Sequence, residues 1–336
     1  MAAPRGNSSL SSRVSALMRA AIVWENHCCM PFEDANRWMP QLQRYVEAGF
    51  DSVHINIGDS DVPLERAIHA LAGYRAWIHQ NSQQFVLASS AADIIDAHHS
   101  GKLAVFFDIE GAHVIGRDPA LIPLFYELGV RWMLMAYNCA NAVGGGCHDT
   151  VDEGLTEFGR RVIAEMDRTG MIKDVAHTGY KTAMQVIECS EVPVNISHSN
   201  PQALNDHPRC VPDDLMKACA ATGGVLGISG LGIFLGGNDS STANMVRSIE
   251  YAVEIMGIDH VGLGLDYVFD QGELSGDFAV KTHIWPSAYY QADTQFVAPE
   301  KIPDIVEALL GKGFRDEDVA KILGDNFMRV ARQVWK

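Results

Sequence analysis

The sequence predicts a (β/α)8 barrel of the TIM type, in which a parallel sheet closes into a ring and helices cover its outside. Apolar runs typical of strands alternate along the chain with stretches of helical periodicity, and the runs number eight. A polar side chain able to bind a metal ion lies at the end of five of them. Strand ends carry the functional residues in such barrels, so we expect these side chains to meet on one face.

Chain length and composition favour a single domain over residues 1–336. A chain of this length with 47% hydrophobic residues can bury one large core, and no Pro/Ser-rich linker divides it. Residues 1–18 are expected to form a poorly ordered or peripheral N-terminal segment.

Each expected strand is a short run rich in β-branched and aromatic residues. In chain order the runs are Ala20–Trp24, Ser52–Ile57, Leu103–Ile109, Val130–Tyr137, Met171–Ala176, Pro193–Ile196, Gly224–Ser229 and His260–Leu265. Helical stripes lie between them, such as those that start at Phe158 and at Val246. Pro212 with the two aspartates after it has the form of a helix start.

Three irregular segments follow expected strands, where the loops of a barrel reach its functional face. They are Asn138–Asp152, Leu231–Ser240 and Tyr267–Pro299. Beyond them, Pro303–Leu310 and Asp316–Val334 have helical periodicity. We expect these extra C-terminal helices to pack against the barrel.

The charge of the chain excludes two classes of partner. There are 42 acidic against 26 basic residues, a formal net charge of −16, whereas nucleic acids and anionic membrane surfaces need clustered positive charge. The apolar stretch near the N-terminus is too short and polar for a secretory core, and no later run is long enough to span a bilayer. We therefore expect a cytoplasmic protein whose cysteines are mostly reduced.

The side chains at the strand ends have the chemistry of a metal site. The candidates are His27, Cys29, Glu110, His177, His198 and Asp266. Cys29 lies two residues after His27, on the same side of an extended backbone, and its thiolate would favour zinc. The 21 residues between His177 and His198 match one strand–helix unit, which places both imidazoles at neighbouring strand ends. Asp266 could bind metal or act as a general base.

The chain resembles the membrane (renal-type) dipeptidases, a zinc peptidase branch of the amidohydrolase-like barrels, along nearly its whole length. The stretches that carry the resemblance are Glu25–Pro31, Asp108–His113, Gly154–Gly159, Asp174–His177, Ile196–Ser199, Val211–Asp214, His260–Asp266 and Leu323–Val330. The resemblance implies a metal-dependent hydrolase type of barrel with one or two Zn²⁺ ions per chain, although another divalent metal could serve. It also implies a homodimer.

The resemblance also implies roles for individual residues. Glu110 would bridge two zinc ions, His177 and His198 would complete one site, and His27 would belong to the other. Asp266 takes the place of the proton acceptor, and Arg209 that of the residue that holds the substrate carboxylate.

Two positions depart from the pattern of the family. Cys29 stands where the family has the aspartate of a His-x-Asp pair, and Tyr137 stands where it has a substrate-contacting histidine. A thiolate can still bind zinc, and a tyrosine hydroxyl can donate a hydrogen bond to an oxyanion. The departures leave open which metal sites fill and which substrate is cleaved.

The expected reaction is hydrolysis of an amide bond by metal-activated water, in a small carboxylate-bearing substrate such as a dipeptide or an N-acyl amino acid. One alternative is a hydrolase on the same scaffold that cleaves a non-dipeptide amide, a cyclic amide or an ester. A second is a non-catalytic binding protein. A third uses Cys28 or Cys29 as a nucleophile, but that mechanism leaves the acids and histidines at the other strand ends without a role.

Overall fold

The computed structural model describes residues 12–59 and 62–336, and a curled parallel sheet is its centre. The strands are β1 (Trp24–Cys29), β2 (Ser52–Asn56), β3 (Phe85–Leu87), β4 (Leu103–Ile109), β5 (Val130–Leu134), β6 (Ile172–Asp174), β7 (Val194–Ser199), β8 (Leu226–Ile228), β9 (Val261–Leu263) and β10 (Tyr267–Val268). Their order is β10-β1-β2-β4-β5-β6-β7-β8-β9, and β3 pairs with β4 beside this path.

The two strands at the ends of this order, β10 and β9, are consecutive in the chain. Only residues 264–266 separate β9 from β10, and β10 pairs in parallel with the end of β1. Within the connection, the backbone N–H of Asp266 donates to the carbonyl oxygen of His27 at 3.1 Å. The sheet therefore curls back on its first strand, and the predicted TIM-type barrel is confirmed.

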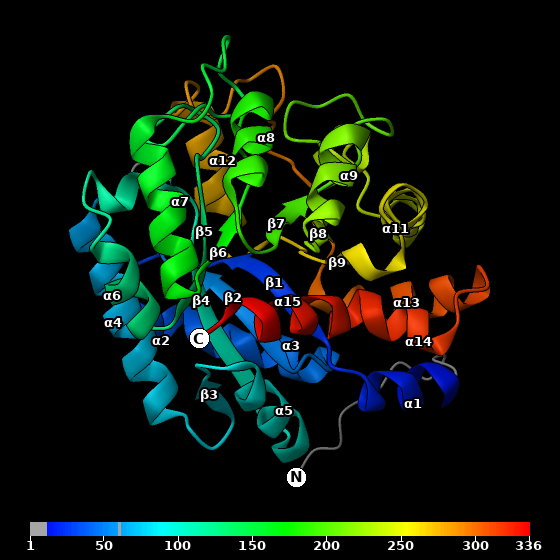
Figure 1. Cartoon of the computed structure of the whole chain (residues 1–336). Helices are drawn as coiled ribbons and strands as arrows, with labels where there is room; N and C mark the ends of the chain where they lie inside the picture. Colours follow the sequence, from blue (N-terminus) through cyan, green and yellow to red (C-terminus); the bar gives the residue numbers. More distant parts are fainter. Residues whose placement is uncertain (1–11, 60–61) are drawn as a thin grey trace.

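The helices lie around the sheet (Figure 1). They are α1 (Ser12–Ala20), α2 (Ala35–Trp38), α3 (Gln43–Ala48), α4 (Leu64–Gln80), α5 (Ala91–Ser100), α6 (Leu121–Glu127), α7 (Glu157–Thr169), α8 (Tyr180–Cys189), α9 (Asp213–Ala221), α10 (Gly232–Leu235), α11 (Thr242–Met256), α12 (Gln271–Val280), α13 (Ile302–Gly311), α14 (Asp316–Ala320) and α15 (Asn326–Val334). Among the helices of the described residues, none has the length and apolar content needed to cross a bilayer.

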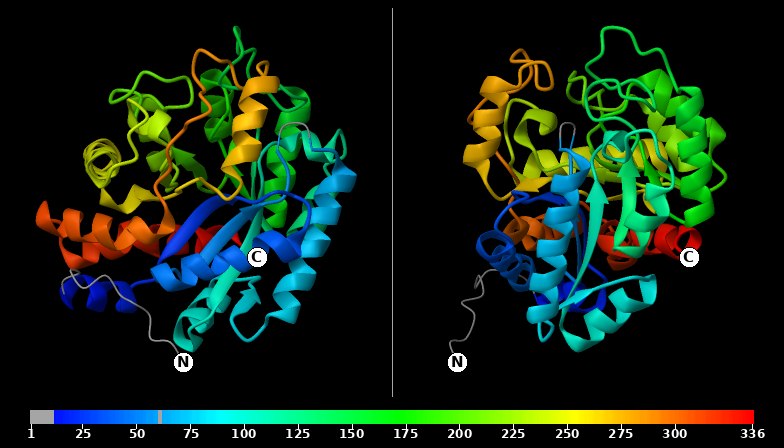
Figure 2. Two further views of the ribbon diagram at one scale, coloured as in Figure 1. Left: turned by 180° about the vertical axis from the view of Figure 1, so that it is seen from behind. Right: turned by 90° about the vertical axis from the view of Figure 1, so that its left-hand side faces the viewer.

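The C-terminal helices pack against the barrel, as predicted. The ring of Trp24, at the start of β1, lies 5.9 Å from that of Phe327 and 5.8 Å from that of Trp335. α12 and the loop after β5 rise at the other end of the molecule (Figure 2). The predicted helical stripes at Phe158 and Val246 form α7 and α11, and Pro212 is the residue before α9.

Two predicted strands are displaced along the chain. The run Ala20–Trp24 was expected to be the first strand, but residues 12–20 form α1 and the strand is Trp24–Cys29. The run Pro193–Ile196 is likewise only the start of β7, which continues to Ser199. Both strands direct buried polar side chains into the barrel, so their sequences lack the apolar pattern used to place them. As a result, His27 and His198 lie within strands and not after them.

The other differences concern short or peripheral elements. The expected loop Tyr267–Pro299 contains β10 and α12, and the three-residue β3 was not predicted. β6, β8 and β9 are shorter than their runs, and β5 ends at Leu134. Residues 1–11 of the expected N-terminal segment lie outside the described residues, whereas α1 buries Val14 and Leu17.

Candidate metal centre

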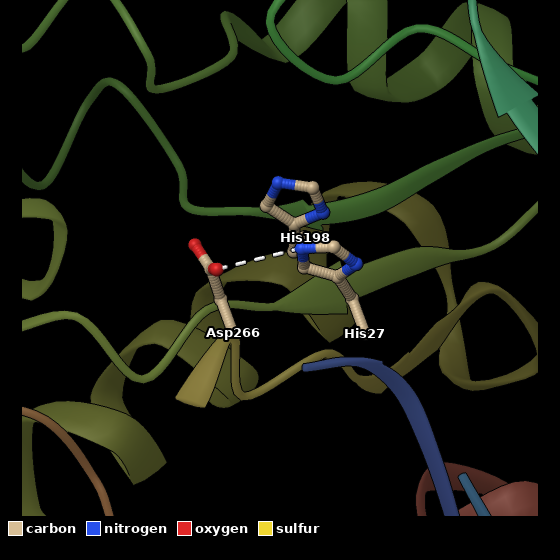
Figure 3. A group of neighbouring side chains, drawn as sticks. All are labelled: His27, His198 and Asp266. Carbon is tan, nitrogen blue, oxygen red and sulfur yellow. Dashed lines mark ion pairs between the residues drawn. The ribbon is translucent and has the colours of Figure 1, made fainter. Parts of the chain in front are cut away.

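The predicted metal ligands come from four strands of the barrel and from the β9–β10 connection, and they lie close together. His27 comes from β1, Glu110 follows β4, His177 follows β6, His198 comes from β7, and Asp266 lies between β9 and β10. All five side chains are buried. Figure 3 shows His27, His198 and Asp266 side by side. His27 Nε2 lies 3.6 Å from Asp266 Oδ1. Side chains far apart in sequence therefore form one cluster.

Glu110 is the centre of this cluster. Its Oε1 lies 3.3 Å from Nε2 of His27, 3.4 Å from Nε2 of His177 and 3.2 Å from Nε2 of His198. Its Oε2 lies 4.0 Å from Cys29 Sγ and accepts a hydrogen bond of 2.8 Å from Asn56 Nδ2. Glu110 thus belongs to two overlapping ligand sets, one with His177 and His198 and the other with His27 and Cys29.

Each histidine is oriented by a second side chain that the sequence analysis missed. Asp108 Oδ2 lies 3.2 Å from His27 Nδ1, Asn138 Oδ1 lies 2.7 Å from His177 Nδ1, and Ser197 Oγ lies 2.8 Å from His198 Nδ1. Such partners fix the ring and the tautomer of metal-binding histidines. The spacing of Asp108 two residues before Glu110 was a usable signal, because alternate residues of a strand share one side.

The donor atoms fit a divalent cation. An acceptor on Nδ1 places a proton there in His27 and His177, which leaves Nε2, the atom that lies against Glu110, to bind a cation. Burial lowers the pKa of His177 well below its usual value and that of His198 to about 3, so both rings are neutral. Their Nε2 atoms are only 3.0 Å apart. A shared cation relieves the repulsion between two lone pairs at that distance, so these residues suit a metal.

Three residues at the cluster have left-handed backbone. The φ angles are 58° at Asn138, 58° at His177 and 57° at Asp266. Asn, Asp and His are the non-glycine types that tolerate this region best. Backbone strain of this kind gathers at functional sites, where the surrounding structure holds it in place.

Cys29 is a ligand candidate and a poor nucleophile. Its Sγ lies 3.2 Å from His27 Nε2. Burial raises the pKa of the thiol far above its usual value, so the thiolate needed for attack does not form by itself. A bound cation would stabilise the thiolate of Cys29 as a ligand. A mechanism in which Cys29 attacks the substrate has no cation to stabilise the thiolate.

Tyr137 and Arg209 lie beside the cluster. The half-buried Tyr137 stacks on the ring of His177, with centroids 4.1 Å apart and an interplanar angle of 18°. Arg209 is 2% exposed, and its Nη2 donates to the carbonyl oxygen of His198 at 3.1 Å. Its buried Nε has no hydrogen-bond partner among the described residues. Within the described part of the chain, Arg209 therefore has an unpaired donor beside the strand that carries His198.

Two hollows reach the cluster. The main cavity exposes Cys29, Glu110, Tyr137 and Asp266. A side cavity is lined by Arg209 and by residues of the loops after β5 and β7. His177 lines both hollows, so both reach the cluster at this residue.

The solved structures with this fold include enzymes. An amidohydrolase from Pseudomonas aeruginosa is 28% identical, with a TM-score of 0.86 over 96% of this chain and 99% of the other. A metallopeptidase from Rhodobacter sphaeroides, liganded with a phosphinate mimic of the dipeptide L-Ala-D-Ala, has the same fold at 21% identity. Its TM-score is 0.76 over 94% of this chain and 100% of that one.

Sequence comparison gives the family. Dipeptidase aclJ of Aspergillus oryzae is 30% identical over 254 residues, which make up 73% of this chain and 56% of that relative. The chain thus spans little more than half the length of this curated relative. Residues 13–276 match the sequence profile of the membrane dipeptidases, peptidase family M19. The chain therefore belongs to the membrane dipeptidase family.

Proposed function

We propose that this protein is a metal-dependent dipeptidase that hydrolyses the amide bond of a small substrate with a free carboxylate. The observation that carries the proposal is the position of Glu110, which two adjoining ligand sets share. Membership of the M19 family supports the same conclusion. So does the phosphinate mimic of a dipeptide held by the related metallopeptidase.

Zinc is the proposed metal, with one or two ions per chain. Imidazole nitrogen, thiolate sulfur and carboxylate oxygen together are the donor set that zinc prefers. His177, His198 and Glu110 would hold one ion, and His27, Cys29 and Glu110 a second. When bound, such an ion supplies Lewis acidity and lowers the pKa of a coordinated water towards neutrality.

The chain's own residues would then move the proton and hold the substrate. Burial, with repulsion from Glu110, raises the pKa of Asp266 to about 7, which suits a group that accepts a proton from the attacking water and delivers it to the leaving amine. The Tyr137 hydroxyl, whose pKa burial keeps above its usual value, would donate to the developing oxyanion. Arg209 would bind the substrate carboxylate.

The first test is the metal content of protein purified without chelators, measured with dipeptide hydrolysis on the same sample. We expect about two zinc equivalents per chain because both ligand sets are complete. Cys29→Ala is expected to lose one equivalent and Asp96→Asn, an exposed change on α5, to lose none. No zinc, or no hydrolysis of any dipeptide by the zinc-loaded protein, would reject the proposal.

A second prediction concerns the carboxylate. Arg209→Met is expected to lower kcat/KM for a dipeptide by about 10- to 100-fold, because a hydrogen bond to a charged group contributes about 1.5–3 kcal/mol. The matched control is the same dipeptide with a C-terminal carboxamide, assayed with both proteins. That substrate has no carboxylate to lose, so the substitution should affect it little. An equal loss on both substrates would mean that Arg209 acts only on the fold.

A related function is a second candidate because Cys29 and Tyr137 stand where the family has an aspartate and a histidine. Either change could favour a non-dipeptide amide, a cyclic amide or an ester on the same scaffold. Including N-acyl amino acids and cyclic amides in the assay separates the two functions.

A further inference from the structure

We propose that the main cavity binds the side chain of the N-terminal residue of the dipeptide and selects bulky apolar side chains over acidic ones. This inference rests on the proposed function and adds a substrate class to it. Three features carry it: an aromatic wall built on its own hydrophobic cluster, a negatively charged rim and the direction of the substrate.

The wall of the cavity is a continuous series of aromatic rings. It starts at Tyr137, which stacks on His177, and continues through Trp285 at 6.0 Å from the Tyr137 ring. Phe278 follows at 5.8 Å and Tyr290 at 5.0 Å from Phe278. All four line the cavity. Aromatic walls of this kind bind apolar groups through area burial and ring contacts.

Three of these rings, Phe278, Trp285 and Tyr290, belong to a hydrophobic cluster that is separate from the barrel core and is called the roof here. Its buried members come from α10 and the residue before it, from α12 and from the segment after α12, with Cys210 in addition. They are Leu231, Ile233, Phe234, Phe278, Ile284, Trp285, Tyr290 and Cys210. Leu274 of α12 packs against the roof while also lining the cavity. Because the roof is not needed to close the barrel, its side chains are free to define specificity.

The rim of the cavity is negatively charged. Four acidic residues, Asp59, Asp270, Glu273 and Asp277, and two basic ones, Arg66 and Lys281, line it. Both bases already have acidic partners: Lys281 pairs with Asp277 at 3.1 Å, and Arg66 pairs with Glu33 at 2.7 Å. Partial burial and repulsion from Asp270 and Asp277 raise the pKa of Glu273. An acidic substrate side chain would meet the same repulsion.

The direction of the substrate follows from the two hollows. Arg209, the proposed carboxylate anchor, lines the side cavity, whereas Asp266 and Cys29 line the main cavity. With the carboxylate on Arg209, the C-terminal residue lies towards the side cavity. The residue on the other side of the scissile bond then extends into the main cavity.

The turnover experiment compares the dipeptides Ala-Gly, Leu-Gly, Phe-Gly and Glu-Gly with the zinc-loaded full chain. We expect kcat/KM for Phe-Gly to exceed that for Ala-Gly by about 10-fold or more, as for methylene groups in an apolar pocket. Glu-Gly should be the poorest substrate. Phe278→Ala should lower the Phe-Gly to Ala-Gly ratio at least ~3-fold. Val280→Ala is the matched control, because Val280 lies on the same helix and is 80% exposed.

A binding experiment separates this inference from the proposed function. Phosphinate analogues of Phe-Gly and Ala-Gly are titrated calorimetrically into zinc-loaded protein that carries Asp266→Asn. This measurement reports binding and does not depend on turnover. The Phe analogue should bind about 10-fold more tightly, and adding Phe278→Ala or Leu274→Ala should reduce the difference. Thermal unfolding checks that each variant folds.

The outcomes have distinct meanings. If no dipeptide is hydrolysed but the Phe analogue binds more tightly, the proposed function fails and the inference stands. Equal affinity of the two analogues, or no binding of either, overturns the inference. The inference is also overturned if Phe278→Ala and Val280→Ala change the preference for Phe-Gly over Ala-Gly by the same factor.

Discussion

Asp266→Asn is expected to lower kcat by about 10²- to 10⁴-fold, the usual contribution of a positioned general base. The amide keeps the size of the carboxylate but cannot accept the proton of the attacking water. Asparagine also tolerates the left-handed backbone at this position, where φ is 57°, so the β9–β10 connection should remain intact. The loss should therefore appear in kcat, with zinc content unchanged.

The measurement is steady-state hydrolysis of one dipeptide together with metal analysis of the same preparation. Asp96→Asn is the matched control, because it makes the same chemical change at an exposed position on α5. A variant that retains full kcat would show that another group accepts the proton. A variant that loses zinc would show that Asp266 acts as a ligand instead.

Glu110→Gln is expected to remove most of the bound metal and, with it, all measurable hydrolysis. The side chain keeps its shape but loses the charge that both ligand sets share. A ligand that binds only the folded state at 100 times its Kd stabilises that state by about 2.7 kcal/mol. Chelator should therefore lower the Tm of the wild-type protein clearly and that of the variant little.

The stability of the two metal-free proteins gives an independent check. Without a cation, burial acts to raise the pKa of Glu110, but the charge of His27 and hydrogen bonds from the three imidazoles lower it well below its usual value, so the carboxylate stabilises the metal-free fold. The neutral amide of the variant loses this attraction. Metal-free Glu110→Gln should therefore unfold at a lower temperature than the metal-free wild type. Glu47→Gln, an exposed change on α3, controls for the substitution itself. Equal zinc in Glu110→Gln and wild type would exclude a bridging role.

Much of the site could be predicted because the apolar pattern of the local sequence indicates where several strands end. Leu103–Ile109 was placed correctly, since an apolar run this long forms a central strand and Glu110 follows it directly. The spacing of His177 and His198 correctly predicted that they are neighbours, because one strand–helix unit separates them. These inferences needed only the side-chain period and the parallel order of strands.

The errors share one physical cause. The strand Trp24–Cys29 was placed too early because its interior faces a polar cluster, and a polar strand lacks the apolar period that identifies strands. The orienting partners Asp108, Asn138 and Ser197 were not recognised because only the folded barrel shows which ring nitrogen each one faces.

By itself the sequence determined the parallel barrel, the types of the candidate metal-binding side chains and the strands that Glu110 and His177 follow, because these depend on local periodicity and chain order. Tertiary structure alone decided how Glu110 is shared among three imidazoles and where the aromatic roof lies. The reason is that both depend on the curl of the sheet and on loops that pack across it. These long-range contacts set the distances between side chains, and chemistry at the site depends on those distances.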